Sequence, residues 1–233
     1  MTEFVSLTGA KCKSTDKGRE TFIEIYDTLN SMSGDEINYI DWEEFAEDNG
    51  LTYVDNGTSR AVFTHETDEL IKGGQRCVVK IPQSSSFQNA MEVVNLNIAN
   101  EIDREFATTR MAPIQDYGEI GKWSIMEMAT SFVSRWDDME EFRNYMKSSG
   151  WEIYDMSASN IGRFNGTIAL LDYGLPFMNI EKSDISEEIY KTIAPSPEYL
   201  GGNNLEVDDI VKESLQGVRN RNVRMENGQL RWS

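Results

Sequence analysis

The sequence predicts an α+β protein of two lobes, and three changes of pattern along the chain support this fold class. Apolar residues first recur at helical spacing, in residues 15–31 and 40–48. From Leu51 onward the pattern alternates and is interrupted by glycine-containing turns, as in antiparallel strands. Beyond residue 174 it becomes helical again. Because helices and strands are segregated instead of alternating regularly, we expect α+β and not α/β.

Two helices are predicted at the start of the chain. In TDKGRETFIEIYDTLNS (residues 15–31) the apolar side chains fall on one helix face, and Thr15 or Asp16 can cap its N-terminus. The segment IDWEEFAED (residues 40–48) has a second, shorter helical pattern that Asn-Gly ends. Residues 1–50 are therefore expected to form a helical N-terminal extension.

Five antiparallel strands and one inserted helix are predicted in residues 51–128, the first lobe. LTYVDNGTSRAVFTH indicates strand, turn and strand, and the β-rich run from Arg76 to Ile81 indicates a third strand. A helix is expected from about Phe87 to Thr108. Two more short strands then flank the turn at Gly118–Gly121.

Residues 129–233 are predicted to form a shorter, mainly helical second lobe, joined to the first near Met126–Ala129. DDMEEFRNYMKSSG predicts a helix that ends at Gly150, and NIGRFNGTIALLD predicts a hairpin that turns on Asn165-Gly166. Helical patterns follow in SDISEEIYKTIA and VDDIVKESLQGVRN, and Asn-Gly near the end of the chain suggests a terminal hairpin.

The composition is strongly acidic, with 22 Lys and Arg against 40 Asp and Glu and a net charge of −18. Nucleic-acid binding through a basic surface is disfavoured, because phosphate contacts need clustered Lys and Arg. The acidity fits a highly charged solvated surface, adaptation to salt, or an inhibitor that mimics DNA. The last is the weakest of the three, because the acidic residues are spread along the chain.

A cytoplasmic protein without a membrane span is expected, and neither cysteine is expected to bind a metal or to form a disulfide. Cys12 and Cys77 have no CxxC spacing and the chain has one histidine, so neither a zinc site nor a disulfide framework is expected. Cys77 is interpreted as core filling. The N-terminal residues lack the pattern of a secretory signal, and no apolar run approaches the roughly 18 residues of a membrane span.

Five polar residues occur in an order that suits nucleotide phosphoryl transfer. That reaction needs a cation on the phosphates, a group that holds this cation, metal ligands, and a carboxylate near the attacking hydroxyl. Lys80 ends a β-rich strand and Glu101 follows in the predicted inserted helix. Asp155 and Asn160 come after the helix that ends at residue 150, and Asp172 ends the apolar strand TIALLD.

At these residues the chain resembles the protein-kinase-like superfamily, over roughly residues 51 to 175. Lys80 in VVKI is similar to the lysine of the V-A-I-K motif, and Glu101 in ANEIDREF to the helix-C glutamate. DMSASN resembles the D-x-x-x-x-N catalytic loop, and the triplet at 172–174 resembles D-F-G. The short second lobe looks most like the minimal atypical kinases, such as the RIO-type kinases and the small kinase of the tRNA threonylcarbamoylation complex.

The resemblance implies a two-lobed kinase fold that uses ATP and Mg²⁺. Asp155 would be the catalytic base, Lys80 would contact phosphate with Glu101 positioning it, and Asn160 and Asp172 would hold the metal ion. The implied nucleotide-binding residues are Gly57, Ser59, Val62, Lys80, Met126, Glu127 and Met128. The turn that contains the first two would cover the phosphates, and the last two would present backbone groups to adenine. Glu105 and Glu92 compete with Glu101 as partners of the lysine.

The resemblance further implies transfer of phosphate to a protein Ser or Thr hydroxyl, although a small-molecule hydroxyl makes the same demands on Asp155. Two departures support rival functions: the phosphate turn has only one glycine, Gly57, and Ile153-Tyr154 stand where the family has His-Arg. The first rival is a pseudokinase or nucleotide-binding interaction module. The second is an acidic inhibitor of a basic partner. Neither the oligomeric state nor the acceptor is predicted.

Overall fold

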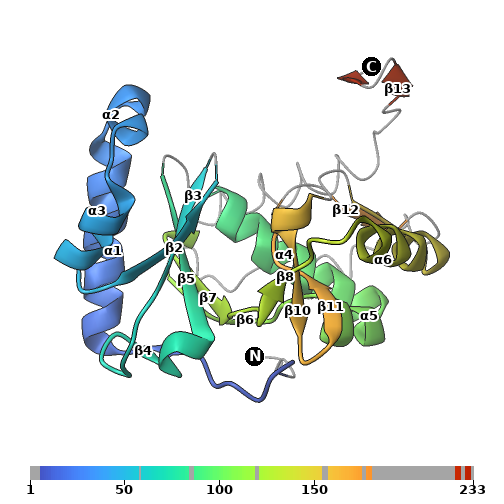
Figure 1. Ribbon diagram of the computed structural model, residues 1–233, viewed down its shortest axis with the longest axis horizontal. Helices are drawn as coiled ribbons and strands as arrows, with labels where there is room; N and C mark the ends of the chain where they lie inside the picture. Colours follow the sequence, from blue (N-terminus) through green and yellow to red (C-terminus); the bar gives the residue numbers. More distant parts are fainter. Residues whose placement is uncertain are drawn as a thin grey trace.

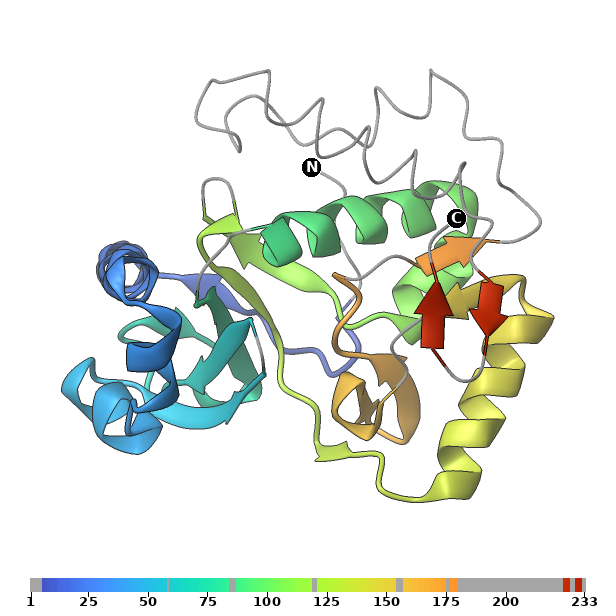
Figure 2. The same cartoon turned by 90° about the horizontal axis from the view of Figure 1, so that it is seen from above.

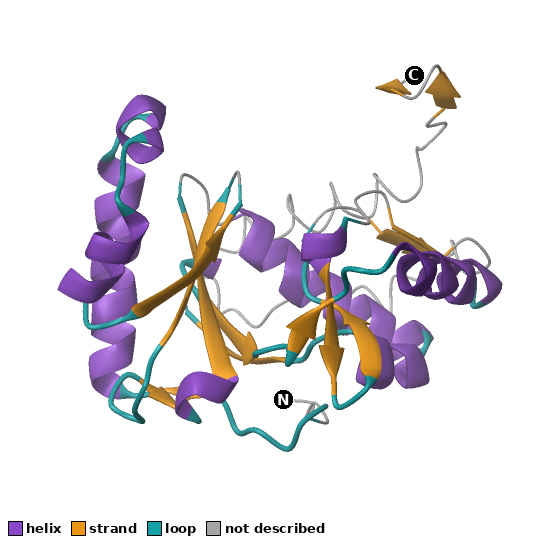
Figure 3. Cartoon of the chain, viewed as in Figure 1, coloured by secondary structure: helices purple, strands orange, loops and turns teal. Residues whose placement is uncertain are grey.

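The computed structural model describes residues 6–57, 59–83, 87–118, 121–153, 157–174, 177–179, 224–226 and 229–231. The described part is an α+β structure, which confirms the predicted class, and every pairing between its named strands is antiparallel. Figure 3 shows helices flanking two separate groups of strands.

A five-stranded sheet, ordered β2-β3-β5-β7-β6, is the largest sheet of the described chain. Its strands are β2 (Thr52–Asn56), β3 (Arg60–Thr64), β5 (Cys77–Pro82), β6 (Ile114–Tyr117) and β7 (Ser124–Glu127). These are the five strands that the alternating pattern predicts. Before β5 the chain turns at Gly73 and Gly74, whose φ values of 101° and 52° favour glycine.

Alternate residues of each strand face opposite sides of this sheet, and the two sides have different partners. Cys77, Val79 and Ile81 of β5 face the side that α1 (Asp16–Ser31) and α3 (Trp42–Asp48) cover. Figures 1 and 2 show these helices, with α2 (Gly34–Asn38) between them in the sequence, on one flank of the sheet. The N-terminal helices therefore share one hydrophobic core with the sheet.

The predicted helix over residues 87–108 is two helices, α4 (Phe87–Ile102) and α5 (Arg104–Arg110). Asp103 separates them, because its side chain accepts a hydrogen bond from Phe106 N at 3.1 Å and so caps α5. Helix α4 packs on the second side of the five-stranded sheet, where Val78 joins a core with Val93 and Leu96.

A second, three-stranded sheet is ordered β11-β10-β8 and comprises β8 (Ser131–Phe132), β10 (Ile161–Phe164) and β11 (Thr167–Leu170). The predicted turn joins β10 to β11: Asn165 and Gly166 have φ values of 50° and 87°. Helix α6 (Trp136–Ser148) lies at the outer side of this sheet in Figure 1. Two short strands, β9 (Trp151–Ile153) and β12 (Phe177–Asn179), pair with each other.

Several predictions for the second half of the chain lie outside the described residues. The two helices expected after residue 180 are among them. The terminal hairpin is described only as two paired strands, β13 (Arg224–Glu226) and β14 (Gln229–Arg231). Within the described ranges, the helices are too short or too polar for any of them to span a bilayer.

The cysteines differ from the prediction, because Cys12 and Cys77 form a disulfide. The expectation that Cys77 merely fills the core, and that no disulfide forms, is therefore wrong. Cys12 precedes the short strand β1 (Lys13–Ser14), which pairs with β4 (Ile71–Lys72). This pairing brings the N-terminal segment to the start of β5, across 65 residues of sequence that contain no recognisable spacing signal.

Candidate functional site

A cleft of about 740 Å³ opens on the second side of the five-stranded sheet, and residues of the three-stranded sheet also line it. The sheet contributes the residues that face away from α1, including Arg60 and Val62 of β3 and Val78 and Lys80 of β5. Nine residues that the sequence singles out line this cleft: Gly57, Ser59, Val62, Lys80, Met126, Glu127, Met128, Asn160 and Asp172. Asp155 lies outside the described residues.

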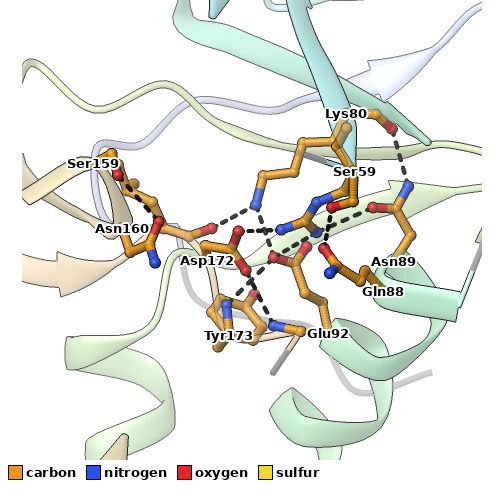
Figure 4. A network of polar contacts seen from close by, with 12 residues as sticks. Ser59, Lys80, Gln88, Asn89, Glu92, Ser159, Asn160, Asp172 and Tyr173 are labelled. Atoms are coloured by element: carbon orange, nitrogen blue, oxygen red, sulfur yellow. Dashed lines mark hydrogen bonds and ion pairs between the residues drawn. The ribbon is translucent and has the colours of Figure 1, made fainter. Parts of the chain in front are cut away.

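Lys80 is buried and its ammonium group pairs with a glutamate of α4. Its Nζ lies 2.8 Å from Glu92 Oε1 and donates a second hydrogen bond to Leu171 O at 2.5 Å. Glu92, not Glu101, is therefore the helix partner of Lys80, which corrects the sequence-based assignment. Glu101 follows nine residues later, about 13 Å farther along the helix axis, so it cannot replace Glu92 at this lysine. Figure 4 shows the pair at the centre of a polar network.

Arg60 is a second buried cation in the same network, and the sequence analysis did not identify it. Its Nη1 lies 2.9 Å from Glu92 Oε1 and donates to Asn89 Oδ1 at 3.2 Å, and its Nη2 pairs with Asp172 Oδ2. The side chain is only 5% exposed. Arg60 thus joins β3 to α4 and to the segment that follows β11.

Asp172 is brought to the cleft by the β10–β11 hairpin and by the residue that follows it. The hairpin pairs Ile161 with Leu170, and Asp172 N lies 3.4 Å from Asn160 O. Tyr173 is buried: its hydroxyl donates to Ala112 O at 2.5 Å and its N donates to Glu92 Oε1 at 3.4 Å. The buried tyrosine fixes the backbone, so the Asp172 carboxylate is left at the edge of the cleft with a side chain 33% exposed.

Gly174 is glycine because two backbone segments approach closely, and not because of its backbone conformation. Its φ is not in the left-handed region, but a Cβ built there would lie 2.7 Å from Gln88 O of α4. Glycine allows the segment after Asp172 to lie directly against the helix that carries Glu92. The close approach therefore supports the position of the charged network.

The charges of this network keep its carboxylate and guanidinium ionised. Burial alone would raise the pKa of Asp172, but the positive charges of Arg60 and Lys80 outweigh it and hold this pKa at about 2. Burial likewise would lower the pKa of Arg60, yet Glu92 and Asp172 raise it above its ordinary value. For Lys80 burial dominates and lowers the pKa, with partial compensation by Glu92. The network thus combines two basic side chains, of Arg60 and Lys80, with two acidic ones, of Glu92 and Asp172.

The turn between β2 and β3, predicted to cover phosphates, is held to α4 and β5. Ser59 Oγ lies 2.5 Å from Gln88 Oε1, and Ser59 O accepts a hydrogen bond from Gln83 N at 2.8 Å. Gly57 N donates to Arg60 O at 2.9 Å and closes the turn. A Cβ at Gly57 would meet no atom within 4 Å, so the turn leaves open space there. Thr58 lies outside the described residues.

The segment predicted to present backbone groups to adenine lies at the opposite end of the cleft. Met126 is buried and lines the cleft, but Met128 N donates to Arg76 O at 2.8 Å. The hydrogen-bond donor that was expected from Met128 is therefore already used within the fold. Ala129, the next residue, also lines the cleft.

Glu127 has a buried side chain that binds the N-terminal segment. Its Oε2 accepts hydrogen bonds from Thr8 N and Thr8 Oγ1 at 2.8 and 2.6 Å, and its Oε1 accepts from Leu7 N and Gln115 Nε2 at 3.1 and 2.7 Å. All four donors are supplied by the fold, so the carboxylate of Glu127 positions the chain start. Any contact of this residue with a ligand would be made by its backbone.

The donor set beside Asp172 suits a hard cation such as Mg²⁺ only in part. From the described residues, Asp172 Oδ1 accepts one long hydrogen bond, donated by Gly174 N at 3.3 Å. Asn160, which also lines the cleft, supplies an amide oxygen to which Ser159 Oγ donates at 3.4 Å. The second oxygen of Asp172 is paired with Arg60. Within the described ranges, no three His, Cys, Asp or Glu side chains are grouped to hold a metal. One carboxylate oxygen and one amide oxygen therefore fit the ion.

Two residues of the network, Arg60 and Glu92, could have been weighted more heavily from the sequence. Arg60 begins RAVFT, where it falls on the same strand face as Val62, and a charged residue at an inward-facing position signals a buried partner. Glu92 is a weaker candidate than Glu101 in the sequence, because the spacing of the glutamates along the predicted helix does not show which of them lies beside Lys80 in the folded protein.

No known protein-family model matches the chain, and no curated protein sequence matches it.

Proposed function

We propose that this chain is an ATP- and Mg²⁺-dependent phosphotransferase with a two-lobed, protein-kinase-like fold, acting on a protein Ser or Thr hydroxyl. In this proposal the five-stranded sheet and α4 belong to the first lobe, and β8, β10, β11 and α6 to the second. The observation that carries the proposal is the cleft in which Lys80, paired with Glu92, faces Asp172 and Asn160. These are the cation, its holder and the oxygen ligands that phosphoryl transfer requires.

Each residue has a separate task in the proposed reaction. Lys80 contacts a phosphate oxygen, and Glu92 keeps its ammonium group directed into the cleft. Asp172 Oδ1 and Asn160 Oδ1 would hold Mg²⁺, which neutralises charge on the phosphates when bound. Asp155 is retained as the base that orients the acceptor hydroxyl, on sequence grounds alone. Met126 and Val62 supply apolar walls for the base of the nucleotide.

A second candidate function, nucleotide binding without transfer, is favoured by one observation. Arg60 forms an ion pair with Asp172, the proposed metal ligand. In this state the carboxylate of Asp172 binds the arginine instead of a metal ion. A pseudokinase of this kind would bind nucleotide and act through contact with a partner.

The test compares four proteins: wild type, Lys80→Met, Asp155→Ala and the control Lys72→Met, which changes an exposed lysine of β4. Wild type and Lys72→Met should be stabilised by MgATP, by about 2.7 kcal/mol at 100 times the Kd, and should transfer the γ-phosphate to a basic acceptor protein. Lys80→Met should lose both properties, and Asp155→Ala should lose only the transfer. Binding without transfer in wild type supports the second function, and a folded wild type that binds no nucleotide excludes both.

A further inference from the structure

Arg60 and Lys80 place two positive charges side by side in the cleft. Lys80 Nζ and Arg60 Nη1 are less than 6 Å apart, because they lie 2.8 and 2.9 Å from the same oxygen, Glu92 Oε1. Both residues line the cleft. Neighbouring phosphate groups of one polyphosphate can span this separation, so one group can bind the ammonium and the next the guanidinium.

The guanidinium of Arg60 has more donors than the described residues use. A guanidinium carries five N–H groups in a planar fork that matches phosphate oxygens. Among the described residues, Arg60 has three partners: Asn89, Glu92 and Asp172. The contact with Asp172 lies toward the cleft, where that carboxylate is partly exposed, and the contacts with Asn89 and Glu92 lie toward α4.

The turn that would otherwise bind phosphate is poor in glycine and is fixed to its neighbours. Gly57 is its one glycine and has open space around it, and Ser59 is engaged with Gln88. A phosphate cradle made of backbone N–H groups is therefore weaker here than in a glycine-rich turn. A fixed cation at the first residue of the following strand can supply the missing stabilisation.

From these observations we infer that Arg60 is a phosphate-binding residue of the cleft, which contacts the di- or triphosphate of a nucleotide beside Lys80. This inference rests on the nucleotide binding proposed above and identifies a residue for it that the kinase-like pattern does not contain. Before nucleotide binds, the guanidinium is neutralised by Asp172. When phosphate takes over that contact, Asp172 becomes available as an oxygen ligand.

The alternative is that Arg60 only joins β3, α4 and Asp172, without touching a ligand. Both roles predict that loss of Arg60 destabilises the protein, so stability cannot distinguish them. The dependence of affinity on the number of phosphates in the ligand does distinguish the two roles. A phosphate contact is made with ATP and ADP and is absent with adenosine, whereas a joining role affects all three ligands alike.

The experiment measures the Kd of adenosine, AMP, ADP and ATP in EDTA, by titration calorimetry, for wild type, Arg60→Met and the control Arg76→Met. Arg76 is an exposed arginine directly before β5, and only its backbone oxygen takes part in the contacts above. Arg60→Met should weaken ATP and ADP by about ten- to a hundredfold, the loss of a hydrogen bond to a charged group, and leave adenosine within about twofold. Arg76→Met should match wild type.

A second pair of variants covers the case in which Arg60→Met fails to fold with Asp172 unpaired. Asp172→Asn removes the carboxylate that Arg60 neutralises, so Arg60→Met is compared in that background, again without metal. The same selective loss of ATP and ADP affinity is expected there.

Equal weakening of all four ligands, or no weakening of any, would overturn the inference while leaving the proposed function intact, provided that Lys80→Met abolishes ATP binding. If folded wild type binds none of the ligands in EDTA and no MgATP either, the proposed function fails and the inference fails with it; binding of MgATP alone would overturn only the inference.

Discussion

Glu92 is the residue on which the charged network depends, because one of its oxygens receives both cations. Replacing it by glutamine would leave Lys80 and Arg60 buried with only Asp172 to balance them. We expect Glu92→Gln to lower the free energy of unfolding by about 3–5 kcal/mol, the usual cost of removing one partner of a buried ion pair. Glu101→Gln is the matched control on the same helix. Urea denaturation of both variants measures the difference.

The comparison decides directly between the structure-based and the sequence-based partner of Lys80. If Glu101→Gln destabilised the protein as much as Glu92→Gln, the pairing described here would not be the one that matters in solution. If only Glu92→Gln does so, the helix residue is assigned correctly. Loss of nucleotide binding should follow the same variant, because an unpaired lysine is no longer held toward the cleft.

Asp172 gives the network a pH dependence whose sign is fixed by its lowered pKa. The carboxyl has a pKa of about 2 in the folded protein, below its value in the unfolded chain, so the unfolded state binds the proton first. The pair with Arg60 therefore stabilises the fold fully above about pH 4, and this contribution is lost as the pH falls toward about 2. The side chain is partly exposed, so solvent screening limits the effect to about 1–2 kcal/mol.

The measurement is the melting temperature of wild type and Asp172→Asn between pH 2 and pH 7. Wild type should be the more stable protein near neutrality, and the difference should shrink steadily below about pH 4. A difference that stayed constant down to pH 2 would show that the carboxylate does not carry the charge effect assigned to it. Other carboxylates titrate in both proteins, so they cancel in the comparison.

Helix α1 lies so close to the chain at residue 70 that its first turn requires glycine. A Cβ on Gly18 would lie 2.1 Å from Leu70 O, a backbone atom that cannot move aside alone. Gly18→Ala should therefore destabilise the protein by about 1–3 kcal/mol, in spite of the better helix propensity of alanine. Gly34→Ala is the control, because Gly34 begins α2 and has no atom within 4 Å of the added Cβ.

Thermal unfolding of the two variants compares the stability effect of an added Cβ in α1 with that in α2, two helices of the N-terminal extension. Gly34→Ala should be neutral or gain up to about 0.5 kcal/mol from propensity. If Gly18→Ala were equally neutral, α1 would not pack against the residues before β4 as described. The test therefore probes how the N-terminal helices attach to the sheet, which the sequence does not specify.

Local sequence patterns predict the strands of the large sheet and the β10–β11 hairpin. The features that the sequence does not predict depend on contacts between residues far apart in the chain. The alternation in β5 and the turn at Asn165 are encoded by neighbouring residues, so strands and hairpin could be placed from the sequence. The break between α4 and α5 depends on whether Asp103 caps a new helix or lies within one long helix, and apolar periodicity alone does not decide this. The partner of Lys80 depends on where α4 crosses the sheet, which no local pattern contains.

At the scale of the whole molecule, the N-terminal segment is fixed to the sheet at several separate points. Glu127 holds residues 7 and 8, Gln115 Oε1 accepts from Cys12 N at 2.7 Å, and Asp116 Oδ2 accepts from Ser14 N at 2.8 Å. Asn165 Nδ2, in the other sheet, lies 3.4 Å from Leu7 O. Residues 7–14 thus contact both sheets that border the cleft, and these contacts help to hold the two sheets together.

The disulfide between Cys12 and Cys77 closes this attachment covalently and encloses the N-terminal helices in one loop. For a loop of this length, constraint of the unfolded chain predicts that the bond contributes about 4 kcal/mol to stability. Reduction by dithiothreitol and the substitution Cys12→Ser should each lower the urea midpoint accordingly, and the reductant should have no further effect on Cys12→Ser.

Disulfides are rare in the cytosol, so the redox state of the same two residues tests the predicted cytoplasmic location. Alkylation of intact cells, followed by mass analysis, measures the thiol state: a blocked pair indicates an oxidising location or a redox-sensitive bond. Two fully alkylated thiols, together with no effect of dithiothreitol on the purified protein, would contradict the disulfide and restore the interpretation of Cys77 as core filling.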